Sequence, residues 1–165
     1  MLGKIINKNL DKNMNKIVIA VSIIVGLSVV VRAQDAMPPA IYFDSEDIGS
    51  DLAASLTQRP NLGIGVISAG EDYNINMIRR NAPAGAIVHP DGTEIHYIVE
   101  GAGVLTTGGV AVRPEGGGAA TIEGGYSQRV TAGDLILIPR GTPHGYTAVE
   151  GVVGYLEIRF RTSEY

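Results

Sequence analysis

The sequence has 165 residues, enough for one domain with a substantial core, and its formal net charge is −4. All four lysines precede residue 17, and beyond residue 33 eight arginines face sixteen acidic residues, which gives −8. An acidic body argues against nucleic acid and against an anionic membrane surface as partners, because both favour a basic patch. Glycine is frequent (22 residues) and Trp is absent, and the apolar runs are short. This composition indicates short strands joined by turns.

The N-terminus has the organisation of an export signal. Residues 1–16 are polar and basic, residues 17–31 are apolar, and small side chains stand at the −3 and −1 positions of a cleavage site ending at Ala33. We therefore expect residues 1–33 to be a signal peptide and the protein to be periplasmic or secreted, without membrane attachment after cleavage. An uncleaved anchor is the weaker alternative, because a membrane span needs about 20 apolar residues. Met14 is an alternative start.

A short N-terminal segment, residues 34–61, is expected before the main domain. Residues 41–43 form a strand candidate, and Asp44 or Ser45 is suited to cap a helix over residues 46–57. The expected helix has an apolar face of residues spaced by four: Ile48, Leu52 and Leu56.

Residues 62–165 read as an all-β domain. The expected strands cover residues 63–69, 74–80, 86–89, 94–100, 103–107, 129–130, 135–138 and 152–161. The glycine-rich stretch 108–125 is expected to be a loop or an irregular hairpin. Short strands at this density, separated by Gly and Pro, are typical of a sandwich or small barrel.

All three histidines lie in two short motifs. The first runs from His89 through Glu94 to His96, and the second ends at His144 after a Gly-Thr-Pro turn. Alternate residues of a strand share a face, so Glu94 and His96 point the same way. Imidazoles and a carboxylate are ligands that borderline divalent metals accept. The histidine positions therefore predict a metal site assembled from two parts of the domain.

Both motifs resemble the paired signatures of the cupin superfamily. The second signature is matched at Gly133, Pro139, Gly141 and His144, with Ala148 at its final Asn position. The first is matched at His89, Glu94 and Gly101, with Asn81 at its initial Gly position and Ile87 at its first His position. The resemblance covers roughly residues 62–161. Within the superfamily, the sequence most resembles small, exported, single-domain bacterial cupins. The resemblance implies a double-stranded β-helix, or jelly-roll, barrel, here with a short N-terminal helix.

Convergence of His89, Glu94 and His144 would give two imidazoles and one carboxylate with open coordination positions. Such a set suits one divalent transition metal (Fe, Mn, Ni, Co or Zn), and a metal-free polar cluster is the alternative. His96 is a candidate fourth ligand in place of the missing first histidine, or a catalytic acid or base, or a buried core histidine. If a strand continues past His144, Tyr146 shares its face and is a candidate catalytic hydroxyl, with ordinary packing as the alternative.

Two functions remain open at this point. One is a metal-dependent enzyme of dioxygenase, lyase or isomerase type that acts on a small organic molecule. The other is a non-catalytic barrel that binds a small ligand such as a sugar or organic acid. Arg79 and Arg80 lie on opposite faces of one strand, so at most one points inward, where it would suit a carboxylate. The resemblance also implies a homodimer, which outward-facing Ile95, Tyr97 and Val99 would fit.

Overall fold

The computed structural model describes residues 37–161, and all of its helices and strands lie in one compact unit that begins at Ile41. The predicted signal peptide and its cleavage site after Ala33 lie outside the described residues. Within the described part of the chain, no helix is both long and apolar enough to cross a membrane.

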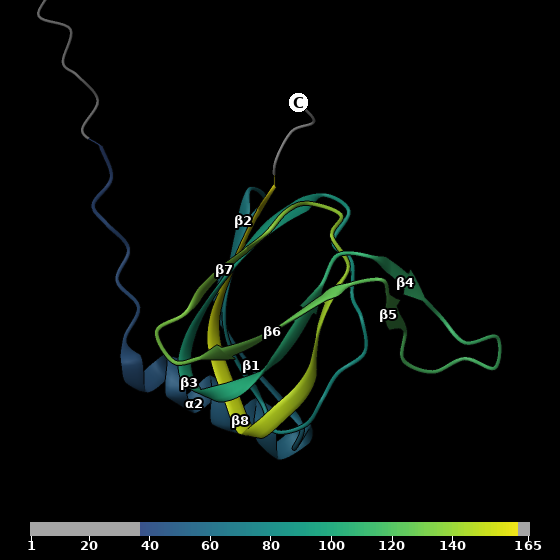
Figure 1. Ribbon diagram of the computed structural model, residues 1–165. Helices are drawn as coiled ribbons and strands as arrows, with labels where there is room; N and C mark the ends of the chain where they lie inside the picture. Colours follow the sequence, from purple (N-terminus) through teal and green to yellow (C-terminus); the bar gives the residue numbers. More distant parts are fainter. Residues whose placement is uncertain (1–36, 162–165) are drawn as a thin grey trace, which may run out of the picture. The chain divides into compact units, whose positions relative to one another are not determined.

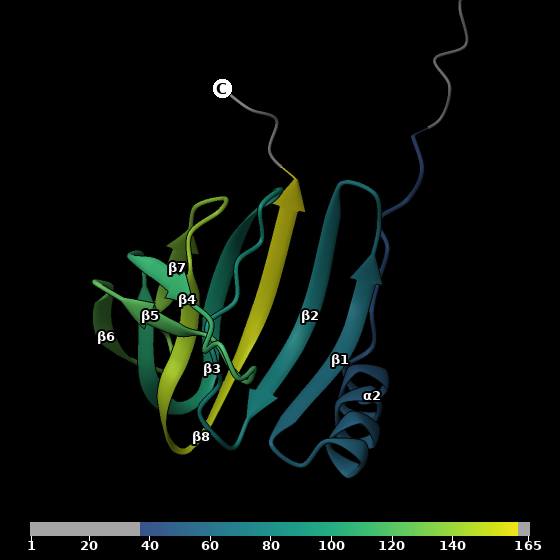
Figure 2. The same cartoon turned by 90° about the vertical axis from the view of Figure 1, so that its right-hand side faces the viewer.

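Helix α2 (Ser45–Gln58) begins where the sequence predicts, because the Asp44 side chain accepts a hydrogen bond from the Glu46 amide at 2.7 Å. The helix packs on strand β1, as Figure 2 shows. Gly63 allows this close approach, since an added Cβ would lie 2.6 Å from Leu56 Cγ. The strand expected at residues 41–43 is wrong: these residues have no strand partner and their side chains are exposed.

The remaining elements are strands. They are β1 (Leu62–Ala69), β2 (Tyr73–Arg80), β3 (Gly92–Thr107), β4 (Val110–Val112), β5 (Thr121–Glu123), β6 (Tyr126–Thr131), β7 (Leu135–Ile138) and β8 (His144–Arg161). Six of them form an antiparallel sheet in the order β1-β2-β8-β3-β6, with β7 also paired to β3, and β4 and β5 form a separate hairpin. The long strands β3 and β8 curve (Figure 1), and irregularities in their pairing accompany the curvature. The result is a jelly-roll β-barrel.

The strand positions correct the sequence-based expectations in four places, one of which is β6, a strand over Tyr126–Thr131 where only residues 129–130 were expected. Residues 94–100 and 103–107 belong to the single strand β3, and β8 begins at His144 instead of residue 152. Residues 86–89 form no strand and contribute one isolated bridge, between Ile87 and His144. The stretch 108–125 contains the β4–β5 hairpin, so the hairpin alternative is confirmed.

Alternation along the central strands gives the barrel a polar end and an apolar end. Paired residues of β2, β8 and β3 form three successive inward rows. The rows are Asn74–Arg159–Glu94, Asn76–Glu157–His96 and Ile78–Tyr155–Ile98. Only the third row belongs to the main hydrophobic cluster. The functional groups of this sheet are therefore concentrated in the first two rows.

The opposite face of β3 carries the side chains that the sequence places outward. Tyr97 and Val99 are each 44% exposed, and Ile95 is half-buried. On the neighbouring strand β7, Leu135 and Leu137 pair with Tyr97 and Ile95 and are also exposed. The predicted inward and outward sets of β3 are confirmed.

Candidate metal centre

The structure brings together the three predicted ligands. His89 Nε2 lies 3.2 Å from Glu94 Oε1, and His144 Nε2 lies 3.4 Å from Glu94 Oε2. Glu94 stands on β3, His144 begins β8, and His89 lies between β2 and β3. Two backbone hydrogen bonds join Ile87 to His144, and the Gly141 amide donates to the His89 carbonyl at 2.9 Å. These bonds hold the His89 segment beside the start of β8.

The donor atoms of this cluster are prepared for a ligand. His144 Nδ1 lies 2.9 Å from the Thr142 carbonyl, an acceptor, so in the neutral ring this nitrogen carries the hydrogen and Nε2 keeps its lone pair. His144 is 2% exposed and Glu94 is 1% exposed, yet His144 Nε2 and Glu94 Oε1 have no hydrogen-bond partner. Buried polar atoms are nearly always satisfied. Two such atoms in one His/Glu cluster therefore fit a divalent metal bound between them.

The charge states also suit metal binding. Burial would raise the pKa of Glu94, but contacts with His144 and His96 outweigh it and hold that pKa well below its usual range. Burial lowers the pKa of His89, and the nearby Arg159 lowers it further, against the effect of Glu94. At neutral pH the cluster thus contains a carboxylate and a neutral His89 imidazole, the forms that bind metals.

His96 approaches the same carboxylate oxygen of Glu94 as His144 does. Its Nε2 is 3.2 Å from Glu94 Oε2 and 4.0 Å from Glu157 Oε2, and its Nδ1 is 3.4 Å from the Tyr146 hydroxyl. Among the described residues, two sets of possible ligand atoms lie within 4.8 Å of one another: His89–Glu94–His144 and Glu94–His96–Glu157. The structure thus groups His96 with Glu94 and Glu157. Glu94 belongs to both sets and connects His96 to His89 and His144.

Of the two arginines expected on opposite faces of β2, Arg80 is the one that points inward. Its Nε donates to the Tyr155 hydroxyl at 2.9 Å, and its guanidinium lies 5.8 Å from the centre of the Tyr146 ring. Burial raises the pKa of Tyr155 to about 12 and raises that of Tyr146 further. Arg79 instead pairs with Glu100 at 2.9 Å. Arg80 is therefore engaged by the tyrosines, away from the metal centre.

Sequence reasoning missed the charged side chains that β8 contributes. Arg159 NH1 lies 2.7 Å and 2.8 Å from the two ring nitrogens of His89 and 3.9 Å from Glu94 Oε1. Glu157 accepts a hydrogen bond from the Asn76 amide at 2.9 Å. A signal was present: in the expected strand 152–161, polar Tyr155, Glu157 and Arg159 alternate with apolar Leu156 and Ile158. That pattern indicates a polar inward face.

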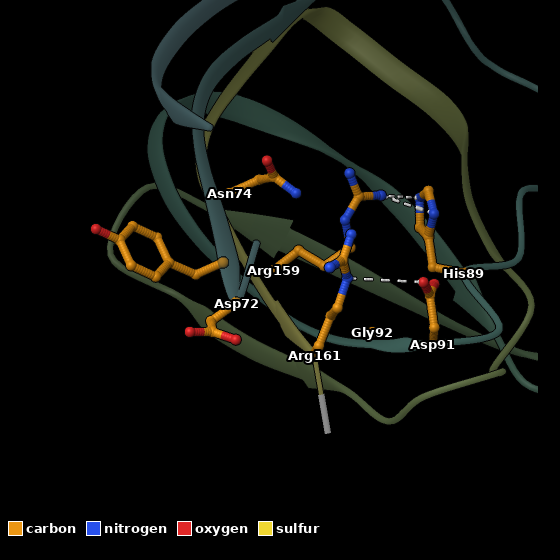
Figure 3. A pocket seen from close by; sticks show the side chains of 8 residues that line it. Asp72, Asn74, His89, Asp91, Gly92, Arg159 and Arg161 are labelled. Atoms are coloured by element: carbon orange, nitrogen blue, oxygen red, sulfur yellow. Dashed lines mark hydrogen bonds and ion pairs between the residues drawn. The ribbon is translucent and has the colours of Figure 1, made fainter. Parts of the chain in front are cut away.

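A cleft of about 330 Å³ opens beside the cluster (Figure 3). Its polar lining includes Asp72, Asn74, His89, Asp91, Arg159 and Arg161. In Figure 3 the Arg159 guanidinium points toward the His89 ring, while Arg161 and Asp91 face each other nearby. His89 is the one member of the three-residue cluster that lines this cleft.

Comparison with known proteins agrees with the fold and the motifs. Residues 88–164 match the model of the AraC-like ligand binding domain, a cupin-type family. The barrel domain has a cupin-type fold. No curated protein matches this sequence.

The solved structures that are similar to this protein have low sequence identity to it. A protein of Bacillus halodurans is 15% identical, with a TM-score of 0.51 over 77% of this chain and 86% of that one. A cupin superfamily protein of Desulfitobacterium hafniense is 12% identical (TM-score 0.46; 61% and 78% covered). A predicted oxalate decarboxylase of Thermotoga maritima is 16% identical (TM-score 0.47; 61% and 81% covered). At these identities the likeness concerns the fold.

Proposed function

We propose that this cupin is a metal-dependent enzyme of dioxygenase, lyase or isomerase type that acts on a small organic molecule. His89, Glu94 and His144 would hold one divalent transition metal: Fe, Mn, Ni, Co or Zn. The observation that carries the proposal is the convergence of these donors beside an open cleft, with two buried donor atoms left without a partner.

The three donors form a set of two imidazoles and one carboxylate. A metal held by three protein ligands keeps coordination positions for a substrate, whereas a purely structural site is closed by four. A bound divalent metal supplies a Lewis acid, and iron adds oxygen chemistry. His89 borders the cleft while Glu94 and His144 are buried, so His89 marks the side from which substrate would approach.

His96 and Tyr146, the predicted catalytic pair, are suited to holding Glu94 in place. An ionised carboxylate is acceptor-only, so His96 Nε2 carries the hydrogen it shares with Glu94 Oε2. For a neutral ring, Nδ1 is then the acceptor and the Tyr146 hydroxyl donates to it. Both side chains are nearly fully buried. Either residue would therefore act on the reaction indirectly, by orienting Glu94 through the hydrogen that His96 Nε2 shares with it.

The first test is elemental analysis of the protein purified without chelator or affinity metal, together with His144→Ala and Glu94→Gln variants. We expect about one equivalent of transition metal in the wild type and little in either variant, because each removes a ligand. Glu100→Gln is the matched control, since Glu100 lies on the same strand, half exposed and paired with Arg79. A wild-type protein that neither contains nor takes up metal would refute the proposed mechanism.

A non-catalytic ligand-binding barrel is the second candidate, and the AraC-like ligand binding domain match supports it. Metal content and turnover separate the two. If the metal-loaded protein binds small acids or sugars but neither consumes oxygen nor converts them, the binding function stands and the enzymatic one fails.

We further propose that the protein is exported, because the basic leader, apolar run and small residues before Gln34 fit a signal peptide. Cell fractionation with N-terminal sequencing tests this directly. Cleavage after Ala33 and recovery outside the cytoplasm are expected, and an intact N-terminus in the cytoplasmic fraction would contradict it.

A further inference from the structure

We propose that the cleft binds a small organic carboxylate, and that Arg159 and Asn74 are the residues that recognise it. The inference deepens the proposed function and rests on it, because it places the carboxylate beside a metal held by Glu94. It concerns two residues that the cupin motifs do not include.

Position is the first observation. On the barrel's inner face Arg159 lies directly between Asn74 of β2 and Glu94 of β3 in the strand pairing. Direct neighbours in antiparallel strands have Cβ atoms about 5 Å apart. Arg159 and Asn74 both line the cleft, and the Arg159 side chain is 24% exposed (Figure 3). A guanidinium and an amide thus stand side by side at the edge of the metal centre.

The second observation is that the charge of Arg159 is incompletely matched. Within residues 37–161, Glu94 is the one carboxylate that approaches Arg159 within 4.0 Å, and its 3.9 Å separation exceeds hydrogen-bond length. The other close contact is with His89, whose neutral ring has a single acceptor nitrogen. A guanidinium has five N–H donors in a planar fork that matches a carboxylate. Most of this capacity is therefore open to a ligand.

Metal binding sharpens this imbalance. A metal at the three-residue cluster takes the negative charge of Glu94 and the lone pair of His89, which are the two partners of Arg159. An anionic ligand would then supply the missing acceptor and countercharge through charge-assisted hydrogen bonds. The same ligand would lie within reach of the metal's open positions, so binding and chemistry would share one location.

Farther out, the cleft is lined by charged side chains of both signs. Arg161 lies 3.9 Å from Asp91, and both side chains are exposed. Asp72 also lines the cleft, and its backbone carbonyl accepts from the Arg161 amide at 2.9 Å. Arg161 and Arg159 each lie 3.9 Å from a carboxylate, but the Arg161 side chain is 60% exposed and solvated whereas that of Arg159 is 24% exposed. Arg159 is therefore the guanidinium that gains more from the carboxylate of a ligand. A volume of about 330 Å³ is at the small end of ligand pockets, which favours a compact acid.

The test is isothermal titration calorimetry of the metal-loaded full chain at fixed ionic strength, with malonate and succinate as probes. Malonamide is the neutral counterpart of malonate. We expect at least one of the two acids to bind. If malonate binds, malonamide should bind at least about tenfold more weakly, because it lacks the negative charge. Arg159→Gln should weaken acid binding about 10- to 100-fold, because a charged hydrogen-bonding partner is lost. Arg79→Gln is the control outside the cleft and should change affinity by less than about threefold, because Arg79 pairs with Glu100 on the outer face.

Asn74→Ala gives a second, milder variant should Arg159→Gln fold poorly, and it should weaken the acids by about three- to tenfold. Unchanged acid binding in Arg159→Gln, or no binding of either acid to the wild type, would overturn the inference. Elemental analysis of the same samples separates the two proposals. If the protein contains metal but its acid binding does not depend on Arg159, the proposed function stands and this inference fails. If acid binding depends on Arg159 but the protein takes up no metal, only the carboxylate site stands.

Discussion

Replacing Glu94 with Gln should abolish most of the stabilisation that a bound metal gives this protein. The change keeps the side-chain shape but removes the negative charge shared by His89, His96 and His144. Mutating residues that merely orient metal ligands typically costs 10- to 100-fold in affinity. Loss of a carboxylate that contacts the metal itself should cost at least about 100-fold, or about 2.8 kcal/mol.

This loss has a defined thermal signature. At a free metal concentration of 100 times the wild-type dissociation constant, binding stabilises the fold by about 2.7 kcal/mol, and a 100-fold weaker site gives about 0.4 kcal/mol. Residues 37–161 form a folded region of 125 residues, for which 1 kcal/mol shifts the melting temperature by about 3–5 °C. The metal-induced shift should therefore fall from about 8–13 °C to about 1–2 °C.

Differential scanning calorimetry with and without metal measures both shifts in one experiment. Glu100→Gln should keep the wild-type shift, since Glu100 lies on the same strand but contacts Arg79 at the surface. A Glu94→Gln protein with the full metal-induced shift would refute the assignment of Glu94 as a ligand, and with it the reasoning from the unpartnered buried oxygen.

Three further predictions follow from burial and charge. Ile98→Ala should lower the free energy of unfolding in urea by about 2–5 kcal/mol, because Ile98 is fully buried. The exposed neighbour Val99 is the control, and Val99→Ala should lower the free energy of unfolding by well under half as much. Equal losses would contradict the strand register. Burial would lower the pKa of His144, but Glu94 raises it above its ordinary 6.5, so the contribution of this contact to metal-free stability is present below pH 6.5 and lost as pH rises through the folded pKa. Metal competes with the same proton, so metal affinity should rise over that window, and a flat titration profile between pH 6 and 8 would argue against His144 as a ligand. Tyr146→Phe should lower turnover and weaken metal binding less than Glu94→Gln does, because the hydroxyl reaches Glu94 only through His96; unchanged turnover and metal affinity would show that the hydroxyl does not help to hold Glu94.

Local sequence patterns determined much of the metal centre. The four residues between His89 and Glu94, and the Gly-Thr-Pro turn before His144, define motifs that are read without a structure. Two-residue alternation placed Glu94 and His96 on one face, because side chains of a strand alternate whatever its partners are. Helix α2 was predictable for the same reason: its cap and its apolar face are local features.

The tertiary structure decided which distant residues surround those motifs. Arg159 and Glu157 lie more than 60 residues from Glu94 and His96, and they become neighbours only through the pairing of β3 with β8. The register of that pairing depends on bulges and on burial across the whole barrel, which no short motif encodes.

The role of His96 shows the same division. Its spacing from Glu94 was equally compatible with a ligand, an acid or base, and a core residue. The structure places its Nε2 against Glu94 Oε2, the oxygen that also faces His144, and near Glu157, which favours positioning of Glu94. Sequence alone thus specified the chemical groups and their faces, because these follow from local geometry. Only the closed barrel specified their neighbours and the open side of the site, because these depend on contacts between strands far apart in the chain.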